Sequence, residues 1–266
     1  MAAKNNFRFE RVAYGYGRDE WIFQDISFMV DAGDSVVLMG ANGSGKSTLL
    51  KMMCGLNFPS AGRFLAFDQE ITEAVLENDR AAKEYHRRVG FVFQNSEAQL
   101  FTTSVWDEIA FGPLQMGLKH DEVKERISDV MEMFAISHLA EKSPYRLSGG
   151  EKKKVALASV LVLNPEVLIL DEPTNGLDPK TQRWLTELLL ELNHQGRTIV
   201  VATHNLDLAH AIADRALVLS ENHKLVFDGP TREALANHKL LIEVNLIDEY
   251  FHIHEGERHI HRYSHN

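Results

Sequence analysis

A glycine-rich segment of eight residues, 40–47, carries the clearest chemical signal in the sequence. It reads Gly-Ala-Asn-Gly-Ser-Gly-Lys-Ser and lies between an expected strand at 35–39 and an expected helix at 48–54. Glycines let the backbone turn so tightly that N–H groups and a helix start converge on phosphate oxygens. In this context the pattern predicts a phosphate-binding loop in which the lysine reaches the β- and γ-phosphates and the last serine offers its hydroxyl to Mg²⁺. The residues expected at the nucleotide are Gly40, Asn42, Gly43, Ser44, Gly45, Lys46, Ser47 and Thr48.

Two adjacent carboxylates, Asp171 and Glu172, end the apolar segment 167–171. Parallel sheets bind ligands at the carboxyl ends of their strands. Asp171 suits Mg²⁺, held through water, and Glu172 suits a general base that deprotonates the water attacking the γ-phosphate. Two acids followed by Pro173 and Thr174 also fit the start of a helix. The phosphate loop upstream favours the catalytic interpretation.

The composition is that of a globular protein with an acidic surface. The 266 residues carry a formal net charge of -10, which argues against a nucleic-acid partner because phosphate backbones bind basic surfaces. The lone Cys54 and the polar first ten residues indicate a reducing compartment without a signal peptide. The most apolar stretch, 155–170, is interrupted by polar residues and is too short to span a bilayer. We expect a cytoplasmic protein.

Short apolar runs alternate with longer amphipathic segments, which indicates a mostly parallel sheet covered by helices. Segments 7–14 and 21–30 alternate polar and apolar residues and predict an antiparallel β-subdomain. Residues 95–146 are helical in pattern, with one apolar helix face at 121–134. A further helix begins at Asp178 and Pro179 and closes at Gly196. The buried strands are expected at 35–39, 89–93, 167–171, 199–203 and 216–220.

The segment Leu147-Ser148-Gly149-Gly150-Glu151 decides the class. Alone, its serine would be an ordinary helix cap. In order, however, the chain carries an aromatic before the first glycine-rich turn, the phosphate loop, Gln94, this segment, the acidic strand, Gly176-Leu177-Asp178 and Thr203-His204. That order resembles the ATP-binding cassette (ABC) family over residues 7–228. The resemblance implies an α/β phosphate-loop ATPase core over 1–228, an N-terminal antiparallel β-subdomain, a helical subdomain inserted at about 95–160, and a C-terminal extension over 229–266.

The resemblance also implies roles for single residues. Tyr16 would stack on adenine, although Tyr14 is equally plausible from the sequence. Gln94 would sense Mg²⁺ and the attacking water, and His204 would hold the γ-phosphate. Two groups of residues would act between subunits: Ser148 and Gly150 on the γ-phosphate of a second subunit, and Asp178 at the dimer seam. Glu151 stands where many members have Gln, and we expect this difference to leave the chemistry unaffected.

The partners follow from the same resemblance. The chain would pair with a second ATPase subunit, identical or paralogous, and attach to transmembrane subunits at the inner face of the cell membrane. Non-transport ABC ATPases insert long coiled coils or fuse two cassettes, whereas here 47–146 lack sustained heptads and each motif occurs once. Segment 89–113 resembles energy-coupling-factor ATPases, which drive prokaryotic uptake of vitamins, cobalt or nickel. Part of this segment would receive the transmembrane partner, and vitamin or other small-solute uptake stays an alternative.

The last fifteen residues hold five of the thirteen histidines. Two His-Ile-His segments place their imidazoles on one side of an extended chain, an arrangement that suits Ni²⁺, Co²⁺, Zn²⁺ or Cu²⁺. A solvated tail without a ligand is the alternative. Together with the family resemblance, the tail favours a cobalt or nickel importer. The histidines in question are His252, His254, His259 and His261.

Overall fold

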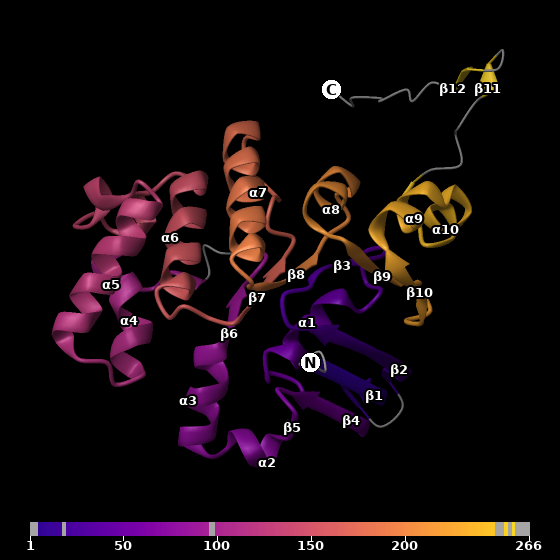
Figure 1. Cartoon of the computed structure of the whole chain (residues 1–266), viewed down its shortest axis with the longest axis horizontal. Coiled ribbons are helices and arrows are strands. Elements are labelled where there is room, and N and C mark those ends of the chain that lie inside the picture. The colour runs from indigo at the N-terminus through magenta and orange to yellow at the C-terminus, as the bar shows by residue number, and fades with distance from the viewer. Residues whose placement is uncertain (1–4, 18–19, 96–98, 248–252, 255–256, 259–266) are drawn as a thin grey trace.

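A six-stranded sheet forms the centre of the molecule in the computed structural model, which describes residues 5–17, 20–95, 99–247, 253–254 and 257–258. Its strand order is β10-β9-β3-β8-β7-β6, and all neighbours are parallel except the pair β9 and β10. Helices α7 and α8 lie on one face, and helix α1 lies with a smaller sheet on the other (Figure 1). The six strands are β3 (Ser35–Met39), β6 (Val89–Val92), β7 (Val167–Asp171), β8 (Thr198–Ala202), β9 (Arg215–Leu219) and β10 (Leu225–Pro230).

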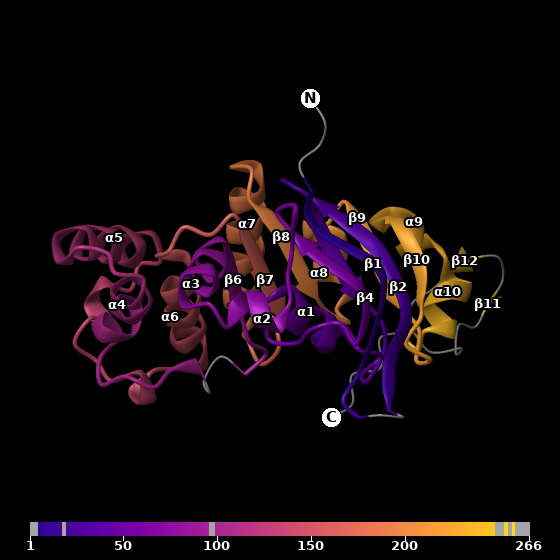
Figure 2. The ribbon, with the colours of Figure 1, turned by 90° about the horizontal axis from the view of Figure 1, so that it is seen from below.

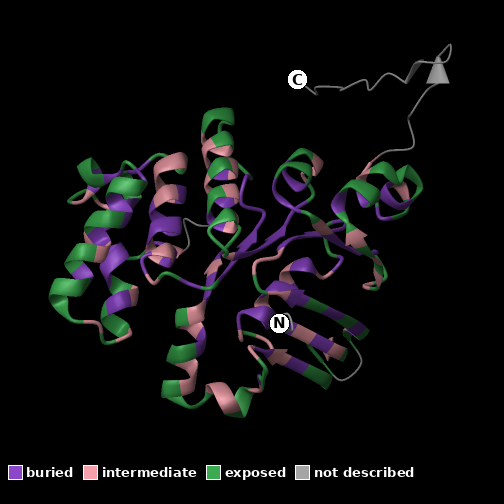
Figure 3. Cartoon of the chain, viewed as in Figure 1, coloured by how far each residue is buried: buried purple, intermediate pink, exposed green. Residues whose placement is uncertain are grey.

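The central strands separate two hydrophobic cores. Because side chains alternate along a strand, Leu168 and Leu170 of β7 pack into the core shared with α7, whereas Val167 and Ile169 pack into the core shared with α1. Strands buried on both faces form continuous apolar runs, as in β7. Figure 3 shows this buried centre between exposed outer helix faces. The buried strands therefore hold the loops at their ends, where the functional residues begin, on a well-packed support.

The smaller sheet is antiparallel, in the order β2-β1-β4-β5. Its inner face is aromatic: Phe9 stacks on Phe28 at 4.5 Å between ring centroids and lies 4.7 Å from Phe64. This face packs toward α1 (Lys46–Met53), which follows the glycine-rich loop (Figure 2). The strands are β1 (Asn5–Gly15), β2 (Trp21–Asp31), β4 (Ala61–Ala66) and β5 (Gln69–Glu70).

A group of helices lies beside the β6 edge of the central sheet (Figures 1 and 2). Helix α5 buries Val123, Ile127, Val130 and Met131, and Phe134 is buried at its C-cap, so the apolar face predicted over 121–134 is confirmed. Helix α6 begins with a capping box between Ser148 and Glu151. The helical segments between β5 and β7 are α2 (Glu73–Leu76), α3 (Asp79–Arg88), α4 (Val105–Gln115), α5 (His120–Met133), η2 (Ser137–Leu139), η3 (Pro144–Arg146) and α6 (Gly149–Leu161).

The C-terminal part of the chain places two helices, α9 (Thr231–Ala236) and α10 (His238–Glu243), beside the β10 end of the central sheet (Figure 1). Asp178 caps α7 and Pro179 is its first residue, as the sequence predicts. No helix among the described residues is both long and apolar enough to cross a bilayer. The remaining elements are α7 (Pro179–His194), α8 (Leu206–Ile212) and the antiparallel pair β11 (Ile253–His254) and β12 (Glu257–Arg258).

The five expected central strands are all present, and so are the antiparallel β-subdomain and the helices that the sequence predicts beside them. Three of the strands differ at their ends: β6 stops at Val92, and β8 and β9 each begin and end one residue earlier than expected. Strands β4, β5 and β10 have no counterpart in the sequence prediction. They are edge or subdomain strands whose pairing partners are distant in the chain.

Candidate functional site

The glycine-rich loop joins β3 to α1 and is shaped by backbone conformations that favour glycine. Gly40, Gly43 and Gly45 have φ values of 146°, 83° and 103°. A Cβ atom at Gly45 would lie 2.6 Å from the Phe23 ring, and one at Gly40 would lie 2.4 Å from the Leu219 carbonyl oxygen. Glycine is therefore required at both positions for the loop to close over the start of α1.

Lys46 lies inside this loop. Its Nζ atom donates to the carbonyl oxygens of Gly40 and Ala41 at 2.8 and 2.9 Å. Burial lowers its pKa, and the carboxylates of Glu172 and Asp171 partly oppose this effect. The ammonium group is thus enclosed by the loop and faces two acids from β7, which is the position from which it can reach a phosphate.

Asp171, at the end of β7, forms the acidic side of the site. Burial raises its pKa, a hydrogen bond from Ser47 opposes this, and Glu172 raises the pKa further. Among the described residues its Oδ1 atom is buried and has no hydrogen-bond partner. A buried carboxylate oxygen beside a serine hydroxyl is a donor set that fits Mg²⁺, which binds oxygen ligands and keeps several waters.

Glu172 is the next residue, and its carboxylate is held by the neighbouring strand. Oε2 accepts from the Thr203 hydroxyl at 3.1 Å, and Oε1 accepts from the His204 backbone N–H at 3.1 Å. The His204 Nδ1 atom lies 2.7 Å from Oε1, and beside an ionised carboxylate the nitrogen is the donor of this hydrogen bond. Glu172 has a φ of 43°, a conformation that costs about 1–3 kcal/mol in a residue other than glycine. Such strain is typical of functional sites.

The two tyrosines in front of the loop differ in exposure. Tyr14 is half-buried, whereas Tyr16 is 60% exposed and places its hydroxyl 3.4 Å from the Thr48 hydroxyl of α1. The two rings meet edge to face at 5.2 Å. Tyr16 is therefore the more exposed of the two rings, and its hydroxyl lies beside the start of α1. Gln94 is exposed and lies two residues beyond the end of β6, the strand that pairs with β7.

A second group of predicted residues lies on a separate surface. Ser148 caps α6, and Asp178 caps α7 by accepting from the Lys180 and Thr181 N–H groups at 2.9 and 3.1 Å. Both residues and Gly150 line a surface hollow of about 520 Å³ that includes no residue of the phosphate loop. Within one chain, this hollow is thus distinct from the site of Lys46.

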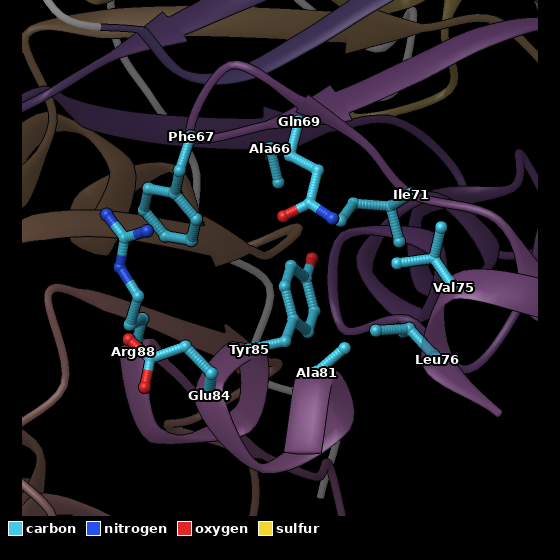
Figure 4. Close-up of a pocket in the computed structure, with 10 residues that line it drawn as sticks. All are labelled: Ala66, Phe67, Gln69, Ile71, Val75, Leu76, Ala81, Glu84, Tyr85 and Arg88. Carbon is cyan, nitrogen blue, oxygen red and sulfur yellow. The ribbon is translucent and has the colours of Figure 1, made fainter. Parts of the chain in front are cut away.

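A small pocket behind α1 lies outside both groups (Figure 4). Its volume is about 80 Å³, room for only a few water molecules and too little for a nucleotide. The Tyr85 hydroxyl donates to the Met53 carbonyl at the end of α1, and the Arg88 guanidinium lies 3.4 Å above the Phe67 ring. The first contact joins α3 to the end of the phosphate-loop helix α1, and the second joins α3 to the turn between β4 and β5.

The sequence did not indicate several contacts of the site. Thr203 holds Glu172, and Lys153 of α6 is only 2% exposed in the vicinity of Asp171. Lys153 sits in a run of lysines that gave no sign of burial. His252, His259 and His261 lie outside the described residues, and for His254 only the backbone is described. Within the described residues, no group of three or more His, Cys, Asp or Glu side chains could hold a metal ion.

A mostly parallel sheet in which a phosphate loop lies beside an acidic strand end is the arrangement of phosphate-loop nucleoside triphosphatases. Residues 23–175 match the family model of the ABC transporter. A protein of Methanosarcina acetivorans, assigned by its name to the ATP-binding proteins of ABC transporters, is 49% identical over 251 residues, 93% of this chain and 91% of that one. The chain belongs to this family of ABC transporter ATP-binding proteins and is an ATPase.

Another relative and two solved structures are also similar to this chain. The nickel import ATP-binding protein NikO of Rhodobacter capsulatus is 49% identical over 218 residues, 81% of this chain and 85% of that one. The structure of CbiO1 from Clostridium perfringens, part of the complex cbiONQ, has a TM-score of 0.78 at 34% identity and covers 91% of this chain and 95% of that one. A dimeric ATP-binding cassette bound to ADP and Pi has a TM-score of 0.75 at 26% identity, with coverage of 85% and 99%.

Proposed function

We propose that this chain hydrolyses ATP with Glu172 as the general base and thereby drives a prokaryotic importer of the energy-coupling-factor type, with nickel or cobalt as cargo. The observation that supports the chemistry best is the fixed carboxylate of Glu172 beside Asp171 and Lys46. Its oxygens are oriented by Thr203 and His204, as a base that must align one water molecule requires.

Each residue has a defined task in this proposal. The loop N–H groups and Lys46 bind the β- and γ-phosphates, and Tyr16 stacks on the adenine. Ser47, Asp171 and Gln94 would hold Mg²⁺, directly or through water, and the ion neutralises charge on the phosphates when bound. Glu172 accepts a proton from the attacking water, and His204 donates to the γ-phosphate through Nε2 when both of its ring nitrogens carry a proton. ADP and phosphate are the products.

The active form in this proposal is a two-fold dimer with a second copy or a paralogue. Ser148, Gly150 and the start of α6 lie away from the phosphate loop of their own chain, so the phosphate they contact is bound by the other subunit. A helix N-terminus favours an anion at this place. Asp178, on the same hollow, would lie at the seam between the two sites.

The surface that meets the transmembrane partner is proposed to include an aromatic pair, formed by Phe101 in the loop before α4 and Phe111 within α4. Phe101 and Phe111 are 57% and 44% exposed and meet edge to face at 4.9 Å. The buried Glu108 carboxylate fixes this loop, because Oε2 accepts from the N–H groups of Phe101 and Thr102 at 3.0 and 2.9 Å. Exposed aromatic side chains that lie together on a fixed loop and the helix beside it are typical of a docking surface.

This docking surface is tested by copurification with the membrane subunits. Replacing Phe101 and Phe111 together by Ala removes the aromatic contact area and is expected to lower the recovery of membrane subunits at least tenfold. The isolated subunit keeps its ATPase rate because neither residue touches the phosphate loop. Val226→Ala, at an exposed position on β10, is the control. Full recovery with the double variant would place the partner elsewhere.

The cargo assignment rests on relatives rather than on this chain's own residues. Proteins named nickel import ATP-binding proteins are 49% and 45% identical to it, and the CbiO1 structure is similar over most of the chain. Uptake of labelled Ni²⁺ and Co²⁺ by cells that express the transporter tests it, with Lys46→Ala as the inactive variant. We expect uptake to fall to background. Undiminished uptake of both ions would favour a vitamin or another small solute.

The histidine-rich tail is proposed to bind the same ions weakly through His252, His254, His259 and His261. In this proposal the tail is dispensable for hydrolysis, because none of the residues assigned to ATP lies in it. Titration of Ni²⁺ and Co²⁺ into the full chain and into a chain ending at Tyr250 tests this. Equal metal binding by the two proteins would refute a metal-binding tail.

A further inference from the structure

The carboxylate of Glu151 occupies the hydrogen-bond donors at the start of α6. Its Oε2 atom accepts from the Ser148 backbone N–H at 2.8 Å and from the Ser148 hydroxyl at 2.7 Å. The backbone and side-chain bonds from Ser148 lower the pKa of Glu151, and Lys142 and His138 act in the same direction. The side chain is therefore an anion at neutral pH, located in the hollow that Ser148 and Gly150 line.

A hydroxyl group has a single proton to donate. In the chain as it stands, the Ser148 hydroxyl gives this proton to Glu151. The γ-phosphate expected at the same helix start needs that proton, so one acceptor must release it. The phosphate and the carboxylate also carry charge of the same sign, and like charges repel at short range. Both effects oppose the arrival of the partner's ATP.

We propose that Glu151 holds the Ser148 hydroxyl and thereby raises the ATP concentration at which two subunits close on each other. This inference rests on the proposed dimer and concerns the regulation of its trans contact. It replaces the expectation that an acid at this position leaves the chemistry unaffected. Lys154 and Lys180 also line the hollow and supply positive charge there. Asp178, the other acid of the hollow, already accepts hydrogen bonds from the backbone N–H groups of Lys180 and Thr181 and from the Thr181 hydroxyl.

The substitution that tests this proposal is Glu151→Gln. Glutamine serves as well as glutamate in a capping box, so the start of α6 stays intact. Its amide is neutral and can donate to the Ser148 oxygen, which frees the hydroxyl proton. Glu125→Gln is the control, since Glu125 is exposed on α5 and does not line the hollow. Both changes are made in a Glu172→Gln background, so that ATP is retained.

Light scattering against ATP concentration measures dimer formation directly. We expect Glu151→Gln to lower the half-maximal ATP concentration by about tenfold, because the effect is repeated at both sites of a symmetric dimer. The control is expected to match its parent, and melting temperatures verify that all proteins are folded. An unchanged or higher ATP requirement in Glu151→Gln would overturn this inference alone. If the Glu172→Gln parent stays monomeric at saturating ATP, the proposed dimer fails and this inference fails with it.

Discussion

Lys153 offers a quantitative test of how helix α6 packs. It lies on the buried face of α6, where only 2% of its surface is exposed. Burial lowers its pKa from 10.5 to about 8, although the negative charge of Asp171 acts in the opposite direction. Replacing Lys153 by Met keeps the length of the side chain and removes the buried charge.

The expected gain in stability follows from this pKa. At about 1.4 kcal/mol for each tenfold change in ionisation, the difference between 10.5 and about 8 corresponds to about 3 kcal/mol at pH 7. The destabilisation by Lys153 depends on pH, because between pH 8 and 10.5 the unfolded chain still binds the proton that the folded chain has released. The free-energy cost of burying Lys153 therefore declines as pH rises through this range. The Met variant gains most below pH 8.

Urea unfolding followed by circular dichroism measures this difference. We expect Lys153→Met to raise the free energy of unfolding by about 2–3 kcal/mol at pH 7 and by about half as much at pH 9.5. Lys124→Met, at an exposed position on α5, is expected to change it by less than about 0.5 kcal/mol. A variant that is no more stable than the parent at pH 7, or whose gain is the same at both pH values, would refute the reasoning.

Two further substitutions test the site. Gly45→Ala is expected to weaken ATP binding and to cost about 1–3 kcal/mol of stability, because the new methyl group meets the Phe23 ring; isothermal titration and urea unfolding measure the two effects, and unchanged ATP affinity would argue against this loop geometry. Asp171→Asn is expected to abolish Mg²⁺-dependent hydrolysis and yet raise the melting temperature at pH 7, because burial raises the pKa of Asp171 and the charged form is the costly one. This gain should shrink as pH falls toward 3.8, and a lower melting temperature at pH 7 would contradict it.

The central strands could be predicted from the sequence because parallel strands buried on both faces are continuous apolar runs. The edge strand β10 could not, since its residues alternate between half-buried and exposed and its position depends on pairing with β9. Strand β4 likewise forms through its register with β1, in which Phe9 faces Phe64 across about fifty residues of chain. Such long-range pairing leaves little local signal.

The same limit applies to the candidate site. The phosphate loop and the acidic strand end are local patterns, so their residues could be named in advance. The contact between Glu172 and Thr203 instead depends on β7 lying beside β8, with Asp171 opposite Ala202. The burial of Lys153 depends on how α6 packs. The greater exposure of Tyr16 than Tyr14 depends on how β1 packs in its sheet and on the turn that follows it.

The proposed role of Glu172 is tested most directly by phosphate release from Glu172→Gln, measured beside its state of association in ATP. The substitution keeps the shape of the side chain and removes the base, so the account predicts hydrolysis slowed by about 10²-fold or more. ATP binding should persist, and the variant should accumulate as an ATP-bound dimer in light scattering. Hydrolysis at the native rate by the purified variant would contradict the assignment of Glu172 as the base.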